Sequence, residues 1–145
     1  IYHSRSVNKK MGKDLNAKKT SLNKLLKISD FISLHVPSNE RTYHLLNKDN
    51  LKLLKSNAVI INTARGNIID EIELVKILKK GKIFSAGLDV YENEPKIHPE
   101  LLKLKNVVLA PHIGSATIEA RTAMAMLAAK NVVNVLKGKK PLTPI

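Results

Sequence analysis

Short strand-like runs alternate with helical patterns along almost the whole chain, and this alternation constrains the fold more than any other feature. The runs at 31–36, 58–62, 83–90 and 107–109 predict strands, and the first three residues look like the end of another. The run at 58–62 is apolar throughout, as expected for a strand covered on both faces. Strands that alternate with helices form βαβ units, which build a parallel sheet with helices on both faces. The sequence therefore predicts an α/β fold.

Residues that start and stop helices mark the predicted helix at 70–80. Asp70 is placed to cap it, and Glu73 lies three residues later, as in a capping box. Gly81 follows the last apolar position and ends the helix. Two shorter helices are predicted, one at 21–28 and one around Leu51, Leu53 and Leu54.

A longer helix is predicted near the end of the chain. It opens at Ser115, runs to about Lys137 and is stopped by Gly138. Apolar residues recur every four positions along it and predict an inner, buried face. These residues are Ala120, Met124, Ala128, Val132 and Leu136.

The composition fits one domain with an aliphatic core. Of the 145 residues, 43% are hydrophobic and only 3% are aromatic. No apolar run reaches the ~20 residues that cross a bilayer, and no charged-then-apolar leader opens the chain. We therefore expect a cytoplasmic protein without a membrane partner. Cysteine is absent, which excludes disulfides and cysteine-ligated metals, and no metal site is expected.

The formal net charge of +13 raises the alternative of a basic protein that binds nucleic acid. The lysines are spread along the whole chain, mostly on the polar faces of the predicted helices. The aromatic residues on which single-stranded nucleic acids stack are also scarce. Both observations favour a lysine-rich solvated surface and no nucleic-acid partner.

The glycines are not spaced as in a phosphate-binding loop. None of the six forms a Gly-x-Gly pair, so the sequence lacks the glycine loop that holds a dinucleotide pyrophosphate. Either the fold does not bind nucleotides, or its first βα unit is missing.

Three side chains that could bind an anion or transfer a proton follow predicted strands. Arg65 follows the run at 58–62, Glu94 comes shortly after the run at 83–90, and His112 follows the run at 107–109. The carboxyl ends of parallel strands meet at one edge of the sheet, where ligands bind. An arginine binds a carboxylate by two parallel hydrogen bonds, and a histidine paired with a glutamate transfers protons near neutral pH. The trio suits a 2-oxo or 2-hydroxy acid.

Four stretches resemble one known family, the D-isomer-specific 2-hydroxyacid dehydrogenases. They are Ser29 to Pro37, Asn62 to Gly66, Ala86 to Val90 with Glu94-Pro95, and Pro111 to Thr117. The spacing from Arg65 to Glu94 to His112 also looks like that of the family's Arg-Glu-His set. The motif His-Ile-Gly-Ser-Ala-Thr, which begins at His112, most resembles that of the glyoxylate/hydroxypyruvate reductase branch.

The resemblance implies a role for each matching residue. Arg65 would bind the substrate carboxylate and polarise the keto oxygen, His112 would donate the proton in reduction, and Glu94 would pair with His112. A nicotinamide cofactor would be bound at positions on both sides of this trio. Its nicotinamide would be lined by Thr63, Ala64, Asp89, His112, Ile113 and Gly114, and its adenosine side would be flanked by Val36 and Pro37.

The missing glycine loop distinguishes this chain from family members of full length. It looks like the C-terminal piece of a longer enzyme with a Rossmann-like sheet that lacks its first βα unit. Residues 1–136 would be the C-terminal portion of the dinucleotide-binding domain, and residues 137–145 a tail leading back towards the substrate domain. The piece alone is expected to be inactive, and the family implies a homodimer.

The type of nicotinamide cofactor is predicted from the loop Ser4-Arg5-Ser6, which ends the strand that contacts the adenine ribose in such a fold. An acidic residue there would repel a 2′-phosphate, whereas a cation and two hydroxyls suit one. NADP(H) is therefore preferred over NAD(H). The alternative is that Arg5 stacks on adenine or faces solvent.

The sequence thus predicts an oxidoreductase that reduces glyoxylate or hydroxypyruvate to the D-2-hydroxy acid. A second hypothesis is a nicotinamide-sensing regulator that binds protein partners on the same scaffold. The basic nucleic-acid binder is the third.

Overall fold

The computed structural model describes residues 1–144, apart from the side chain of Met11. The chain forms two compact units, Ile1–Pro111 and His112–Ile145. The first unit holds the sheet and the second holds one long helix.

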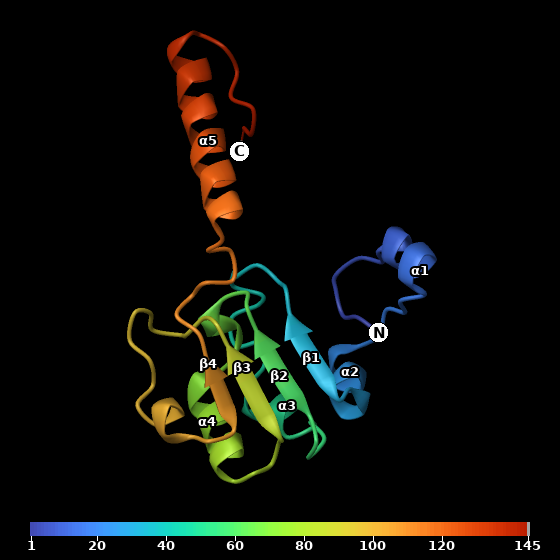
Figure 1. Cartoon of the computed structure of the whole chain (residues 1–145). Helices are drawn as coiled ribbons and strands as arrows, with labels where there is room; N and C mark the ends of the chain where they lie inside the picture. Colours follow the sequence, from blue (N-terminus) through green and yellow to red (C-terminus); the bar gives the residue numbers. More distant parts are fainter. Residues whose placement is uncertain (145) are drawn as a thin grey trace. The chain divides into compact units, whose positions relative to one another are not determined.

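Four parallel strands form the sheet of the first unit (Figure 1). They are β1 (Phe31–Leu34), β2 (Val59–Asn62), β3 (Ser85–Leu88) and β4 (Val107–Leu109), and they lie side by side in this order. The register places Ile32 opposite Ile60, and Ile60 opposite Ala86. All three pairings are parallel, so the carboxyl ends of the strands share one edge. The prediction of a parallel α/β sheet is confirmed.

Four short helices belong to the first unit: α1 (Lys9–Leu15), α2 (Leu22–Ile28), α3 (Lys48–Leu51) and α4 (Glu71–Lys79). Two 3-10 turns, η1 (Gly66–Ile68) and η2 (Leu101–Lys103), complete it. Helix α3 begins earlier than predicted, because Asn47 caps it and leaves Leu53 and Leu54 beyond its end. Residues 1–3 form no strand, only an isolated bridge between Tyr2 and Lys19.

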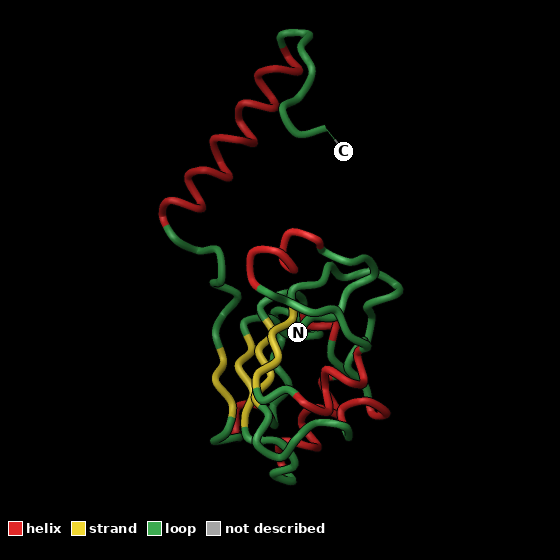
Figure 2. Tube along the Cα trace, turned by 90° about the vertical axis from the view of Figure 1, so that its right-hand side faces the viewer, coloured by secondary structure: helices red, strands yellow, loops and turns green. Residues whose placement is uncertain are grey.

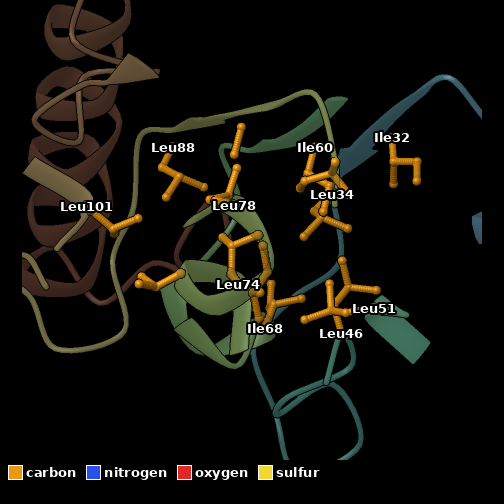
Figure 3. Packing of buried hydrophobic residues seen from close by; sticks show 14 of the residues in the cluster. Ile32, Leu34, Leu46, Leu51, Ile60, Ile68, Leu74, Leu78, Leu88 and Leu101 are labelled. Carbon is orange, nitrogen blue, oxygen red and sulfur yellow. The ribbon is translucent and has the colours of Figure 1, made fainter. Parts of the chain in front are cut away.

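The core lies on one face of the sheet. Ile32, Leu34, Ile60 and Leu88 point into it and are buried. They pack against apolar residues of the surrounding helices and turns, as Figure 3 shows for Leu46, Leu51, Ile68, Leu74, Leu78 and Leu101.

The opposite face of the sheet is much more open. Phe31 and Val108 are 75% and 74% exposed, and Val59 and Ile61 are only half-buried. In Figure 2, the red helices of the core layer lie to one side of the yellow strands. Within residues 1–111, the face of β2 that carries Ile60 is buried, and the face that carries Val59 and Ile61 is half-buried.

The predicted cap of α4 is present, but the capping box is only half formed. The Asp70 carboxylate accepts from the Glu73 backbone N–H at 3.1 Å. The Glu73 carboxylate does not return this bond, because it pairs with Lys76 at 2.6 Å and the Asp70 N–H donates to the Leu46 carbonyl instead. Gly81 ends the helix with φ of +60°, a conformation that favours glycine.

The long helix α5 (Ile118–Leu136) starts later than predicted, because Thr117 and not Ser115 caps it. Thr117 accepts from the Ala120 N–H at 3.1 Å. Within the second unit, the predicted inner face is left uncovered: Met124 and Val132 are 62% and 57% exposed. The segment after Gly138 returns along the helix, where Asn131 accepts from the backbone N–H groups of Leu142 and Thr143.

Candidate functional site

A single amide shapes the turn that carries Arg65. Asn62 ends β2 and is 1% exposed. Its side-chain oxygen accepts from the Ala64 N–H at 3.1 Å, and its side-chain nitrogen donates to the Arg65 carbonyl at 2.9 Å. The turn from Thr63 to Arg65 is therefore closed on a buried group at the carboxyl edge of the sheet.

Gly66 brings this turn against the loop that follows β3. A Cβ at position 66 would lie 1.9 Å from the carbonyl carbon of Tyr91 and 2.3 Å from the backbone nitrogen of Glu92. Such distances are impossible for real atoms, so only glycine allows the approach. The turn that follows Arg65 and the loop that leads to Glu94 are consequently in direct backbone contact.

The loop after β3 is held at both of its ends. The buried Asp89 donates its backbone N–H to the Asn62 carbonyl at 3.0 Å. The Tyr91 hydroxyl donates to the Ala110 carbonyl at 2.8 Å, and the Tyr91 N–H donates to the Glu94 carboxylate at 2.9 Å. Burial, followed by the nearby Asp89 charge, raises the pKa of the Tyr91 hydroxyl. The loop thus presents Glu94 from a fixed backbone.

The structure brings Arg65 and Glu94 into one unit, on loops that contact each other through Gly66 and Tyr91. Both side chains are exposed, and Arg65 Nη1 donates to the Ala64 carbonyl at 2.6 Å. His112, which has φ of +56°, begins the second unit together with Ile113 and Gly114. The convergence of His112 with Arg65 and Glu94 stays a prediction.

The residues predicted for the adenosine side of the cofactor lie in two places. Val36 and Pro37 follow β1, where the Pro37 carbonyl accepts from the Thr42 hydroxyl at 2.6 Å. The loop Ser4-Arg5-Ser6 is closed by a hydrogen bond from the Ser4 hydroxyl to the Ser6 carbonyl. It borders an open hollow of about 750 Å³, to which Lys19 and Thr20 also contribute.

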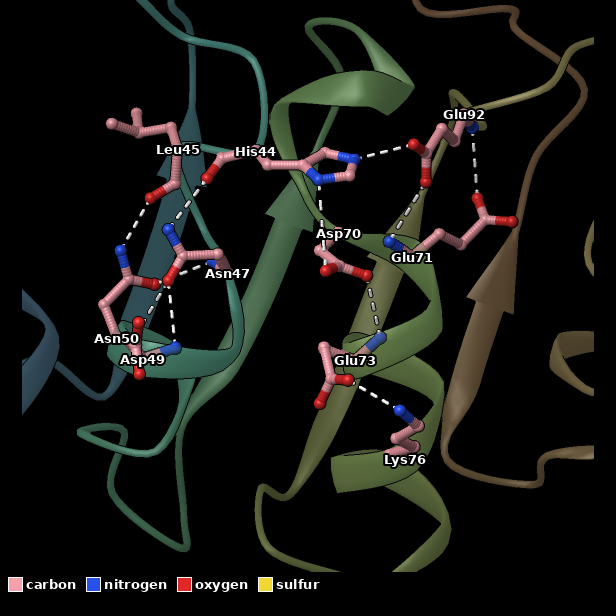
Figure 4. A network of polar contacts seen from close by, with 10 residues as sticks. All are labelled: His44, Leu45, Asn47, Asp49, Asn50, Asp70, Glu71, Glu73, Lys76 and Glu92. Atoms are coloured by element: carbon pink, nitrogen blue, oxygen red, sulfur yellow. Dashed lines mark hydrogen bonds and ion pairs between the residues drawn. The ribbon is translucent and has the colours of Figure 1, made fainter.

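Four residues form a polar network that the sequence analysis did not find: His44, Asp70, Glu71 and Glu92 (Figure 4). His44 Nε2 lies 2.6 Å from a Glu92 carboxylate oxygen, and His44 Nδ1 lies 3.9 Å from Asp70. Glu92 and Glu71 each accept the other's backbone N–H. No spacing rule links position 44 to position 92, because the contact depends on the tertiary fold.

The described residues contain no cluster of three or more His, Cys, Asp or Glu side chains that could hold a metal ion. Among the same residues, no helix is both long enough and apolar enough to cross a membrane.

Comparison with known families decides what this arrangement belongs to. Residues 1–114 match the family described as D-isomer specific 2-hydroxyacid dehydrogenase, NAD binding domain. The chain belongs to the D-isomer-specific 2-hydroxyacid dehydrogenase family. This membership confirms the resemblance inferred from the motifs around Arg65, Asp89 and His112.

A glyoxylate reductase from Thermococcus litoralis is 53% identical over 141 residues, which are 97% of this chain and 43% of that protein. Among solved structures of the family, a glyoxylate reductase from Paecilomyes thermophila has 40% identity and a TM-score of 0.89, over 98% of this chain and 43% of that one. An NADPH-dependent glyoxylate/hydroxypyruvate reductase from Sinorhizobium meliloti, solved with NADP and malonate, has 35% identity and a TM-score of 0.91, over 99% of this chain and 44% of that one.

These likenesses confirm the Rossmann-like α/β dehydrogenase fold. The chain spans less than half the length of the curated relatives that it matches, 43% for the Thermococcus litoralis glyoxylate reductase. The extent of the match agrees with the predicted C-terminal portion of a longer dehydrogenase. The relatives are named as reductases, and they give no support to a regulatory module that only senses nicotinamide.

Proposed function

We propose that the protein containing this chain reduces a small 2-oxo acid, glyoxylate or hydroxypyruvate, to the D-2-hydroxy acid with a nicotinamide cofactor. The observation that carries the proposal is the backbone contact between the Arg65 turn and the Glu94 loop at the carboxyl edge of the sheet. The relatives that are named glyoxylate reductases support the choice of substrate.

Each side chain has a role that its chemistry suits. The Arg65 guanidinium binds the substrate carboxylate as a planar fork and polarises the adjacent keto oxygen. His112 gives its proton to that oxygen, and Glu94 holds the imidazole in the donating orientation. The cofactor, when bound, supplies the hydride that reaches the carbonyl carbon. One hydride and one proton convert the 2-oxo acid to the 2-hydroxy acid.

The nicotinamide end of the cofactor would be held by the backbone around Thr63 and Ala64, by Asp89, and by the segment from His112 to Gly114. Within the first unit, the Asn62 side chain fixes the Thr63–Ala64 backbone, and the Asp89 N–H is tied to the Asn62 carbonyl. These contacts give the cofactor a preorganised surface along the ends of β2 and β3.

The cofactor would be NADP(H) in preference to NAD(H). Lys19 Nζ donates to the Arg5 carbonyl at 2.7 Å and so brings a second cation to the Ser4-Arg5-Ser6 loop. Two cations and the Ser4 hydroxyl border the same open hollow, and this donor set fits a 2′-phosphate. The Sinorhizobium meliloti relative, solved with NADP, supports the same choice.

Residues 1–136 would form the C-terminal portion of the dinucleotide-binding domain, and residues 137–145 would lead towards the substrate domain. A mainly apolar hollow of about 560 Å³ lies between the segment at Ile1–Ser4 and the edge strand β1. A further strand beside β1 would fill this hollow, which supports a first βα unit outside the described chain. The whole protein would be a cytoplasmic homodimer, and this chain alone would be inactive.

The deciding experiment is turnover of a panel of 2-oxo acids by the full-length protein, followed by the loss of reduced nicotinamide absorbance. The panel contains glyoxylate, hydroxypyruvate, pyruvate and phenylglyoxylate, each with NADPH and with NADH. The proposal requires the highest kcat/KM for glyoxylate or hydroxypyruvate with NADPH. Oxidation of D-glycerate but not L-glycerate, the chiral product of hydroxypyruvate reduction, tests the stereochemistry. No turnover of any member of the panel would refute the proposal.

A further inference from the structure

The segment around His44 runs alongside the residues that follow Arg65. The His44 N–H donates to the Asn67 carbonyl at 2.9 Å, and the Leu46 N–H donates to the Ile68 carbonyl at 3.1 Å. The Asp70 N–H returns a bond to the Leu46 carbonyl at 2.8 Å. The backbone of His44 is therefore attached to the 3-10 turn η1, which directly follows Arg65.

The His44 imidazole points from this position to the other loop of the site, as Figure 4 shows. Its Nε2 lies 2.6 Å from a Glu92 carboxylate oxygen, so the ring donates its N–H to the carboxylate. The two side chains are only 25% and 18% exposed, which shields the pair from water. His44 has φ of +45°, a strained conformation for a residue other than glycine, and Tyr43 stacks on its ring at 4.0 Å.

Glu92 is also bound on its other side. Its second carboxylate oxygen accepts from the Glu71 N–H at 3.3 Å, in the first turn of α4. The Glu71 carboxylate, which is buried, accepts from the Glu92 N–H at 3.1 Å. Side chain and backbone of Glu92 are thus both fixed, one residue after Tyr91 and two residues before Glu94.

We propose that His44 is a positioning residue that acts through Glu92 to hold the loop of residues 91–94, and with it Glu94, against the Arg65 turn. The inference rests on the proposed function in one respect, because it takes Glu94 as the carboxylate that orients the proton donor. The hydrogen-bonded chain from His44 through Glu92 to Glu71 is a fact of the fold. Partners that orient a functional group in this way affect activity without touching the substrate.

The test compares His44→Leu, which keeps the bulk of the side chain and removes the donor, with His44→Gln, which keeps an N–H near the Nε2 position. Glu92→Gln removes the charge of the acceptor, and a His44→Leu/Glu92→Gln double variant completes a cycle. His98→Leu is the matched control, because His98 is also half-buried and hydrogen-bonded but lies outside the site. All variants are made in the full-length protein.

Two readouts are taken. The first is hydrogen–deuterium exchange of peptides that cover residues 91–94, without cofactor or substrate. The second is kcat and KM for glyoxylate with NADPH, together with the Kd of NADPH. We expect His44→Leu to speed exchange at 91–94 and to lower kcat about tenfold. The Kd of NADPH should stay within about twofold of the wild-type value. His44→Gln should restore most of the slow exchange at 91–94 and most of kcat. The double variant should lose no more kcat than His44→Leu alone.

Unchanged exchange at 91–94 in His44→Leu would overturn the inference, whatever happens to kcat. Equal losses of kcat in His44→Gln and His44→Leu would also overturn the inference, because the N–H donor at position 44 would then not matter. If His44→Leu does not fold, Glu92→Gln takes its place with the same expected results. If the wild-type protein reduces no 2-oxo acid, the proposed function fails, and the exchange data still decide whether His44 holds the loop.

Discussion

Gly66 lies so close to Tyr91 that a methyl group on its Cα would sit 1.9 Å from the Tyr91 carbonyl carbon. Gly66 directly follows Arg65, and Tyr91 donates its N–H to Glu94. One pair of backbones thus links the residue proposed to bind the substrate to the residue proposed to assist proton transfer.

Replacing Gly66 by alanine should destabilise the fold. The new Cβ would meet backbone atoms of Tyr91 and Glu92 that cannot rotate away, and overpacking of this kind costs about 3 kcal/mol. Chemical denaturation of the full-length protein measures the loss. Gly87→Ala is the control, since a Cβ at Gly87 meets nothing within 4 Å. Equal denaturation midpoints for Gly66→Ala and Gly87→Ala would contradict the close contact between Gly66 and Tyr91.

Arg65→Lys should lower kcat/KM for the 2-oxo acid roughly 10- to 100-fold. Lysine keeps the charge but cannot form the two parallel hydrogen bonds, and a hydrogen bond to a charged group contributes about 1.5–3 kcal/mol. Steady-state kinetics with glyoxylate measure the effect. Arg41→Lys, at an exposed position after β1, should leave kcat/KM unchanged. Wild-type kinetics for Arg65→Lys would remove Arg65 from the site.

His112→Ala should reduce kcat by on the order of 10²–10⁴, the range for loss of a general acid. Cofactor binding should survive, because the other proposed contacts of the nicotinamide, at Thr63, Ala64 and Asp89 and at the backbone of residues 113–114, do not need the imidazole. Single-turnover kinetics with saturating NADPH separate the chemical step from binding. The idea fails if kcat stays within a factor of about two, or if His98→Ala, a histidine outside the site, has the same effect.

Arg5→Asp should reverse the cofactor preference. The carboxylate would repel the 2′-phosphate of NADPH and accept a hydrogen bond from the ribose hydroxyl of NADH. The ratio of kcat/KM for NADPH to that for NADH should fall by roughly 100-fold, in line with the loss of one charge-assisted contact and the gain of one repulsion. An unchanged ratio would favour the alternative in which Arg5 stacks on adenine or faces solvent.

Tyr91→Phe should cost about 1 kcal/mol of stability at neutral pH, because the Leu88 and Ala110 carbonyls lose a donor. Burial raises the pKa of the folded Tyr91 above the ordinary value of 10.0, so the unfolded chain releases its proton first. The contribution of Tyr91 to stability is therefore complete below pH 10 and declines as the pH rises towards the folded pKa. Denaturation curves from pH 8 to 11 should show a smaller alkaline decline in the variant than in the wild type.

The sheet could be predicted from the sequence because each strand lies within an apolar run that is followed by residues that favour turns. β4 was predicted at its observed bounds, and the cap of α4 at Asp70 follows from a local rule. The start of α5 was misplaced because Ser115 and Thr117 are both good capping residues, and only the backbone shows which one accepts from the helix.

The proposed functional positions divide in the same way. Arg65, Glu94 and His112 could be proposed because they follow predicted strands and match a family motif. His44 and Glu92 could not, because their contact joins loops that are distant in the chain, and each residue alone is typical of a solvated surface. Gly66 was quoted only as part of a motif, and its close approach to Tyr91 appears only in three dimensions.

The Asn62 amide that closes the Arg65 turn cannot ionise, although it supplies both a donor and an acceptor. The hydrogen bonds that close the turn of the proposed carboxylate anchor, Arg65, therefore do not depend on the titration of Asn62. A bend in a plot of log kcat/KM against pH should then come from other groups, and not from a titration of the amide that closes this turn.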